Sequence, residues 1–96
     1  MSTGVVVILF NPDVEHVNAL INAFLAPEWN IVLVDNSFER TQYSASRNVT
    51  YIHCPSNVGI AQAQNIGLKR LFDNDVEHAF LLDQDSLFSP DIAHEL

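Results

Sequence analysis

Four short apolar segments constrain the fold of this chain more than any other feature. They are continuous rather than alternating, each is rich in Val, Ile, Leu or an aromatic residue, and they occupy residues 5–10, 31–34, 49–54 and 79–82. A strand with one face in water alternates apolar and polar residues, whereas a strand buried on both faces is apolar throughout. The four segments are therefore predicted to be strands of a sheet that is covered on both sides, which is typical of parallel sheets.

Two amphipathic segments alternate with these strands. Residues 13–26 carry apolar side chains at spacings of three and four, which predicts a helix that begins near Asp13 and ends before Pro27. Residues 59–72 repeat the pattern, with Asn57 as the expected cap and two basic residues near the negative end of the helix dipole.

The remaining segments complete the order of elements. The polar residues 36–48 are long enough for a crossover between parallel strands, and residues 91–96 are expected to begin a further helix. The chain therefore predicts an α/β fold, a three-layer sandwich with a mainly parallel sheet of about four strands.

Length and charge limit the classes of function. The 96 residues carry a formal net charge of −8 and are 48% hydrophobic, which indicates one small folded domain spanning residues 1–96. We expect no nucleic-acid binding, because only four basic residues are present: Arg40, Arg47, Lys69 and Arg70. The sequence shows no secretory signal, so we expect a cytoplasmic location. Cys54 is the single cysteine, which excludes an internal disulfide.

Small polar residues follow every predicted strand. Parallel sheets bind ligands in the crevice beyond the carboxyl ends of their strands. The most informative end holds Asp83 and Asp85, because two carboxylates so close in sequence repel each other unless a donor or a cation compensates them. Hard oxygen ligands suit Mg²⁺ or Mn²⁺, which are commonly shared with substrate phosphates. The glycine-rich fingerprints of dinucleotide-binding and P-loop proteins are absent.

Four segments together resemble the start of an inverting glycosyltransferase of family 2, which has the nucleotide-diphospho-sugar transferase (GT-A) fold. They read VVVILFNP (5–12), IVLVDNS (31–37), NVGIAQAQNIG (57–67) and LLDQDS (81–86). Within that family, the ending FNP and the combination of NVGIAQAQN with LLDQDS look most similar to bacterial rhamnosyltransferases of polysaccharide assembly. The resemblance implies that the chain is the N-terminal half of the GT-A fold.

The resemblance also implies roles for individual positions. A contact with the nucleotide sugar is implied for Asn11, Asp35, Asn36, Asn57, Gly59, Asn65 and Asp83. Asp35 would lie by the base, with Asn36 beside it and Asn11 in the first loop of the same pocket. Asp83 and Asp85 match the family's Asp-x-Asp motif, which meets the ribose and, through Mg²⁺ or Mn²⁺, the diphosphate.

The activity implied is transfer of a sugar, with dTDP-rhamnose as the expected donor, to a saccharide or lipid-linked acceptor in cell-surface polysaccharide synthesis. In the family, the acceptor site and the general base belong to a downstream half. We therefore assign no catalytic residue and expect these 96 residues to be inactive alone. An incomplete sheet would expose an edge and apolar surface, so we also expect a homodimer. The full enzyme would work at the inner face of the membrane.

Two alternative functions are considered. A nucleotidyltransferase on the same fold would need a glycine-rich basic loop after its first strand. Here that loop begins with Asn11, Pro12 and Asp13, which include no glycine and no basic residue. A non-catalytic, acidic, metal-binding interaction or regulatory domain is the alternative from another class. Metal affinity independent of any nucleotide would favour it, whereas metal affinity that rises with a nucleoside diphosphate would favour the transferase.

Overall fold

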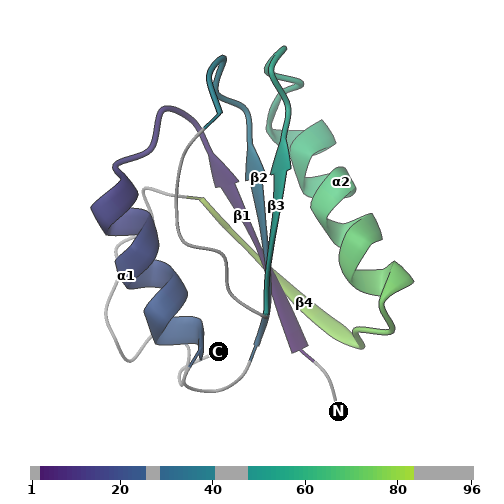
Figure 1. The fold of residues 1–96 in the computed structure, drawn as a ribbon. Coiled ribbons are helices and arrows are strands. Elements are labelled where there is room, and N and C mark those ends of the chain that lie inside the picture. Colours follow the sequence, from purple (N-terminus) through teal and green to yellow (C-terminus); the bar gives the residue numbers. More distant parts are fainter. Residues whose placement is uncertain (1–2, 26–28, 41–47, 84–96) are drawn as a thin grey trace.

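The computed structural model describes residues 3–25, 29–40 and 48–83 (Figure 1). In chain order the elements are β1 (Thr3–Leu9), α1 (Val14–Leu25), β2 (Asn30–Asp35), β3 (Val49–His53), α2 (Ile60–Asp73) and β4 (His78–Asp83). The four predicted strands and the two predicted helices are thus confirmed, with small shifts at their ends. The helix expected over residues 91–96 lies outside the described residues.

The four strands form one parallel sheet in the order β3-β2-β1-β4. The first strand lies at its centre, where Val5 is in register with Ile31 of β2 and with Phe80 of β4. Parallel neighbours run in the same direction, so the carboxyl ends of β1, β2 and β3 gather at one edge of the sheet (Figure 1). This edge carries the polar residues that the sequence placed after the strands.

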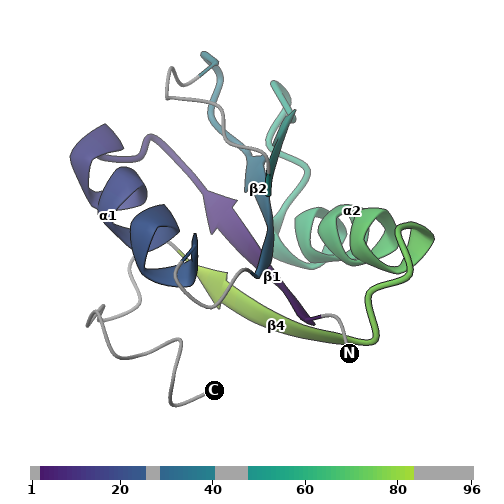
Figure 2. The ribbon, with the colours of Figure 1, turned by 60° about the horizontal axis from the view of Figure 1, so that its bottom comes forward.

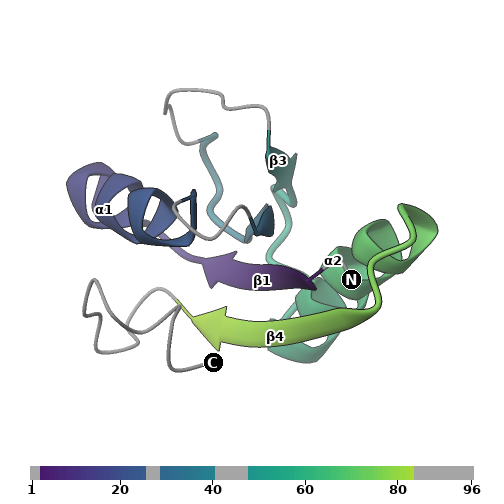
Figure 3. The ribbon, with the colours of Figure 1, turned by 90° about the horizontal axis from the view of Figure 1, so that it is seen from below.

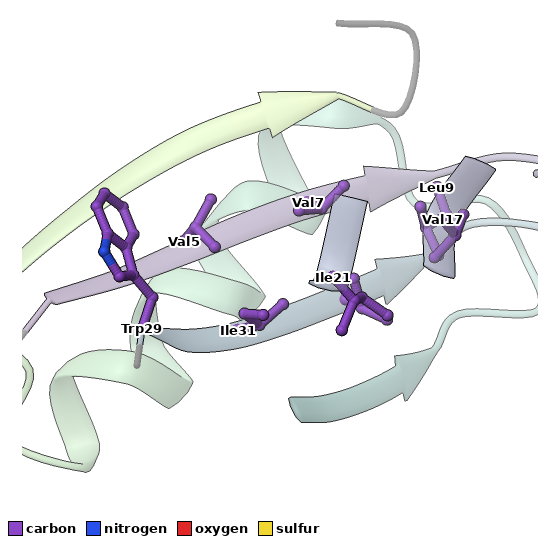
Figure 4. Close-up of a cluster of buried hydrophobic side chains, with 8 residues drawn as sticks. Val5, Val7, Leu9, Val17, Ile21, Trp29 and Ile31 are labelled. Carbon is purple, nitrogen blue, oxygen red and sulfur yellow. The ribbon is translucent and has the colours of Figure 1, made fainter. Parts of the chain in front are cut away.

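The two helices cover opposite faces of the sheet, as Figures 2 and 3 show. Successive strand residues point to opposite faces. In β1, Val5, Val7 and Leu9 pack with residues of α1 (Figure 4), whereas Val6 and Ile8 pack with residues of α2. The sheet therefore has a hydrophobic core on each side, which explains its continuous apolar strands and confirms the predicted three-layer sandwich.

Trp29 closes the amino end of the core on the α1 side. Its side chain is buried, and its ring centroid lies 5.3 Å from that of Phe80 at an interplanar angle of 33°. Such tilted aromatic pairs are favourable beyond the area that they bury. Trp29 is therefore a core residue and is not available to stack on a ligand.

Gly67 sets the distance between α2 and the sheet. A Cβ atom at this position would overlap the two Cγ atoms of Val6 and press on Cγ2 of Val34. The glycine lets the helix backbone approach β1 and β2 closely, with Ala63 and Leu71 buried on the same side of the helix. A small residue here is thus a requirement of packing, at the cost of the lower helix propensity of glycine.

Candidate functional site

Asp35 is the last residue of β2 and is completely buried. Its Oδ1 accepts a hydrogen bond from the backbone N–H of Ser37 (2.9 Å), and its Oδ2 accepts one from the hydroxyl of Tyr51 (2.6 Å). A buried carboxyl group is stable only when its oxygens find donors. Asp35 therefore fixes the turn that follows β2 against the neighbouring strand β3.

Asn36 joins the same turn to two other elements. Its N–H donates to the carbonyl of Leu9 at 2.8 Å, which continues the pairing of β2 with β1. Its side chain is buried between two backbone groups: Oδ1 accepts from the N–H of Val58 (3.2 Å) and Nδ2 donates to the carbonyl of Gly59 (3.4 Å). Asn36 thus ties the end of β2 to the segment that leads into α2.

Ser37 extends these connections to the loop after β1. Its Oγ accepts a hydrogen bond from the N–H of Asn11 at 2.6 Å, and its carbonyl lies 2.9 Å from Nε2 of His53. A carbonyl only accepts, so Nε2 of His53 carries the proton in this contact. Asp35, Asn36 and Ser37 are hereafter called the strand-end hub, because they connect the ends of β1, β2 and β3 with the start of α2.

The start of α2 differs from the sequence-based expectation. The capping residue is Gly59, not Asn57, and no side chain caps the helix. Gly59 has φ +88°, a conformation in which a side chain would be strained, and the Oδ1 of Asn57 accepts from the N–H of Gly59 at 3.2 Å. Asn57 therefore shapes the turn before the helix, and the N–H groups of the first turn receive no hydrogen bond from a capping side chain.

Asn11 and Asn57 both lie in the left-handed region, with φ of 45° and 46°. Asparagine tolerates this region better than most residues because its short side chain can bond locally. Both side chains are exposed beside the buried hub. Two of the sequence-predicted residues thus stand where they can reach a ligand, on turns that their backbone conformation defines.

Asn65 is not brought into this group. It lies two residues from both Ala63 and Gly67, which face the sheet, so it is on the opposite side of α2 and is exposed. Asn65 is therefore on the surface of α2 that faces away from the sheet and from the strand-end hub.

Asp83 ends β4, where it is in register with Ile8 of β1. The next residue of β1, Leu9, is in register with Asp35. Strands are spaced about 4.8 Å apart, so the backbones at Asp83 and Asp35 are separated by roughly 10 Å across β1. Asp83 thus lies at the same edge of the sheet as the hub, and Asp85 lies outside the described residues.

The carboxylates at the end of β4 and just after it are candidate ligands for a metal ion. Carboxylates after a strand are the oxygen ligands that Mg²⁺ and Mn²⁺ prefer, so the chemistry of Asp83 and Asp85 fits such an ion. Within residues 3–25, 29–40 and 48–83, no group of three or more His, Cys, Asp or Glu residues could hold a metal. An ion at this edge would therefore need ligands from the bound substrate, as Mg²⁺ commonly has.

Cys54 follows β3 and is buried. Its N–H donates to the carbonyl of Asp35 at 2.7 Å. Burial, and after it the charge of Asp35, raise the pKa of the Cys54 thiol above its ordinary value of 9.0. The thiolate is the reactive and metal-binding form, so Cys54 is a packing residue.

Exposed apolar side chains surround the hub. They lie just after β1, just after β2, or within the two residues before α2 and at its first residue, and they are Phe10, Phe38, Val58 and Ile60. Phe38 is the most exposed of them, with 82% of its surface accessible. Apolar groups gathered around a polar centre are typical of a surface that contacts a ligand or another protein.

Three members of the network have no role predicted from the sequence. Ser37 belongs to the hub, and Tyr51 and His53 bond to it. One signal was present: Tyr51 and His53 are polar groups at alternate positions of an apolar strand, so they share a face. Their partners could not be identified without the order of the strands.

Known proteins identify the family to which this fold and site belong. The model of the family described as "Glycosyl transferase family 2" matches residues 4–96. The chain belongs to glycosyl transferase family 2. Its parallel sheet with a helix on each face is the architecture of the N-terminal half of the GT-A fold, so the predicted fold class and family are confirmed.

The chain is similar in sequence to a curated protein, the dTDP-rhamnosyl transferase RfbF of Shigella flexneri. It is 32% identical to this family 2 chain in an alignment of 84 residues that covers 84% of the chain. The chain spans only 28% of the length of that protein. No solved structure matches the chain significantly. Among the described residues, neither helix has the length and apolar character needed to cross a bilayer.

Proposed function

We propose that this chain is the donor-binding part of a glycosyltransferase and that it binds a nucleotide-diphospho-sugar at the strand-end hub. The observation that carries the proposal is the hub itself, which holds the ends of three parallel strands and the start of α2 at the same end of the sheet at which β4 ends in Asp83. Parallel sheets bind ligands at this position. Membership of family 2 supports glycosyl transfer as the chemistry.

The proposal divides the predicted residues by position. Asn11, Asn57 and Gly59 are exposed next to the hub and would contact the nucleotide sugar. Asp35 and Asn36 are buried, so they would act by holding the loops in place. Asn65 lies on the side of α2 away from the sheet, so the proposal gives it no contact with a donor bound at the hub.

The phosphates of the donor need positive charge, which this acidic chain supplies sparsely. Asp83 and Asp85 would hold Mg²⁺ or Mn²⁺, and the bound ion would stabilise the departing diphosphate. The N–H groups at the start of α2, which no side chain caps, would face the phosphates as well, because a helix N-terminus favours anions.

The donor proposed is dTDP-rhamnose. It is supported by the similarity to a protein described as a dTDP-rhamnosyl transferase. The acceptor proposed is a saccharide or a lipid-linked saccharide of cell-surface polysaccharide synthesis, met in the cytoplasm at the inner face of the membrane. We propose that the transfer is inverting and that the acceptor site and general base belong to protein beyond residue 96.

Calorimetric titration of dTDP into the 96-residue chain, with and without Mn²⁺, tests the donor site. We expect binding that requires Mn²⁺ and that weakens at least about tenfold in Asp83→Ala and in Asp85→Ala, because each loses a ligand of the ion. Asp73→Ala is the matched control. Asp73 is exposed at the end of α2 and pairs with Lys69 at 3.0 Å, away from the strand ends, so its replacement leaves dTDP affinity unchanged.

Two results would contradict the proposal. Binding of dTDP that is indifferent to Mn²⁺ and to both aspartate variants would remove the metal from the site. Affinity for Mn²⁺ that is the same with and without dTDP would favour a metal-binding regulatory domain instead.

We also propose that the 96 residues form a homodimer and transfer no sugar alone. Within the described part of the chain, β4 pairs on one side only, and Leu81 in this strand is 43% exposed. An unpaired strand edge readily pairs with another chain. Light scattering over micromolar to millimolar concentrations should show a mass that rises toward twice 10.7 kDa. A constant monomer mass, or turnover of dTDP-rhamnose by the chain alone, would refute the respective expectation.

A further inference from the structure

Two side chains of the edge strand β3 reach the hub from the same face of the sheet. Tyr51 and His53 lie at alternate positions, and their rings stack at a centroid distance of 6.4 Å and an interplanar angle of 11°. Arg40 packs its guanidinium over the ring of Tyr51, 4.6 Å from the ring centroid. The stacked rings therefore form a rigid wall beside the turn that follows β2.

Each ring holds a different end of the hub. The hydroxyl of Tyr51 donates to Oδ2 of Asp35, at the start of the hub. Nε2 of His53 donates to the carbonyl of Ser37, at its end. The conformation of Ser37 in turn places its Oγ for the N–H of Asn11. The hydrogen bonds thus link β3 through the turn after β2 to the loop after β1, whose Asn11 is exposed.

We infer that His53 is a positioning residue for donor binding, a role that rests on the proposed function. It touches neither the nucleotide nor the metal site in this proposal. Its Nε2–H fixes the carbonyl of Ser37, and Ser37 fixes the backbone of Asn11 in the left-handed conformation that directs the loop. Holding a loop in its bound conformation before the ligand arrives lowers the entropy lost on binding.

His53 separates this role from general stability better than Tyr51 does. Loss of the Tyr51 hydroxyl would leave an oxygen of the fully buried Asp35 without this donor, which destabilises the whole sheet. The partner of His53 is a backbone carbonyl at the end of the hub, and the imidazole itself is only partly buried. Loss of the His53 donor therefore frees the carbonyl of Ser37 and the loop bonded to it, while both hydrogen bonds of the Asp35 carboxyl group remain.

The test compares two replacements of His53. Glutamine keeps an N–H donor at about the reach of Nε2, whereas leucine has similar bulk and no donor. We expect His53→Leu to weaken Mn²⁺-dependent dTDP binding by about five- to tenfold, the loss of one hydrogen bond, and to speed hydrogen exchange at the Asn11 amide by about tenfold. His53→Gln should stay within about twofold of the wild type in both measurements. The Val7 amide, in the central strand β1, reports global opening and should exchange at the wild-type rate in both variants.

Two outcomes overturn the inference. Wild-type affinity and wild-type Asn11 exchange in His53→Leu would show that His53 positions nothing. Equal losses in the leucine and glutamine variants would show that the donor is not the cause. If the wild-type chain binds no dTDP, the proposed function fails, and the exchange of Asn11 alone decides whether His53 orders the loop.

Discussion

Replacing Asp35 with Ala should lower the free energy of unfolding by about 3 kcal/mol. The substitution leaves the N–H of Ser37 and the hydroxyl of Tyr51 without their carboxyl acceptor, and each such loss costs about 1–3 kcal/mol in a buried place. It also leaves a small void at the end of β2. For a small domain this is a large share of a total stability of roughly 5–15 kcal/mol. Urea unfolding followed by circular dichroism measures the change.

Asp73→Ala is the matched control for this experiment. Asp73 forms an exposed ion pair with Lys69 four residues earlier, and such pairs contribute about 0.5 kcal/mol or less. Tyr51→Phe removes one of the two hydrogen bonds of the Asp35 carboxyl group. Its loss of stability should therefore lie between those of Asp35→Ala and Asp73→Ala. Equal stability of Asp35→Ala and Asp73→Ala would mean that the carboxyl group of Asp35 does not hold the turn.

Gly67→Ala should destabilise the protein by about 1–3 kcal/mol, although the same change in an open helix stabilises it by about 1 kcal/mol. The sign reverses because the new methyl group would overlap the side chain of Val6 and press on Val34. The helix must then move away from the sheet, which opens the core on the α2 side. Thermal unfolding monitored by circular dichroism should show a lower midpoint than the wild type.

Two further variants isolate the cause. Ala61→Gly, on the exposed side of the same helix, measures helix propensity without packing and should destabilise by about 0.5–1 kcal/mol. Val6→Ala removes the atoms that the new methyl group meets, so its cost should be smaller in the Gly67→Ala background than alone. Additive effects of the two changes, or a stabilised Gly67→Ala, would exclude the proposed overlap.

The fold could be predicted from the sequence because its local and global signals agree. Continuous apolar strands demand cover on both faces, and the two amphipathic helices supply it. The one local error, at the start of α2, arose because Asn57 is a good capping residue by type. The backbone instead needs a positive φ at position 59, where only glycine is free of strain, and this moves the helix start past Asn57.

The site was predicted less completely, for a physical reason. The sequence placed Asp35 and Asn36 at a strand end, which is correct, and suggested that they face a ligand. Their side chains turn inward because β3 and the segment before α2 offer donors and acceptors at that point. Those partners are more than fifteen residues away along the chain, so only the pairing of β2 with β3 brings them together. The position of Asn65 could not be predicted for a similar reason. Its place relative to the hub depends on which face of α2 packs on the sheet, and that face is known only from the structure.

The central strand β1 is the first of the described strands to be synthesised, and its neighbour β4 is the last. The hydrogen bonds of the hub described above are made by residues no later than Gly59. The hub can therefore assemble on the nascent chain while residues 78–83 are still in the exit tunnel, as amino-terminal units generally do. Joining Thr3 to His78 then closes a long loop, whose entropic cost grows only slowly with length. Synthesis thus builds the strand-end hub before it delivers Asp83.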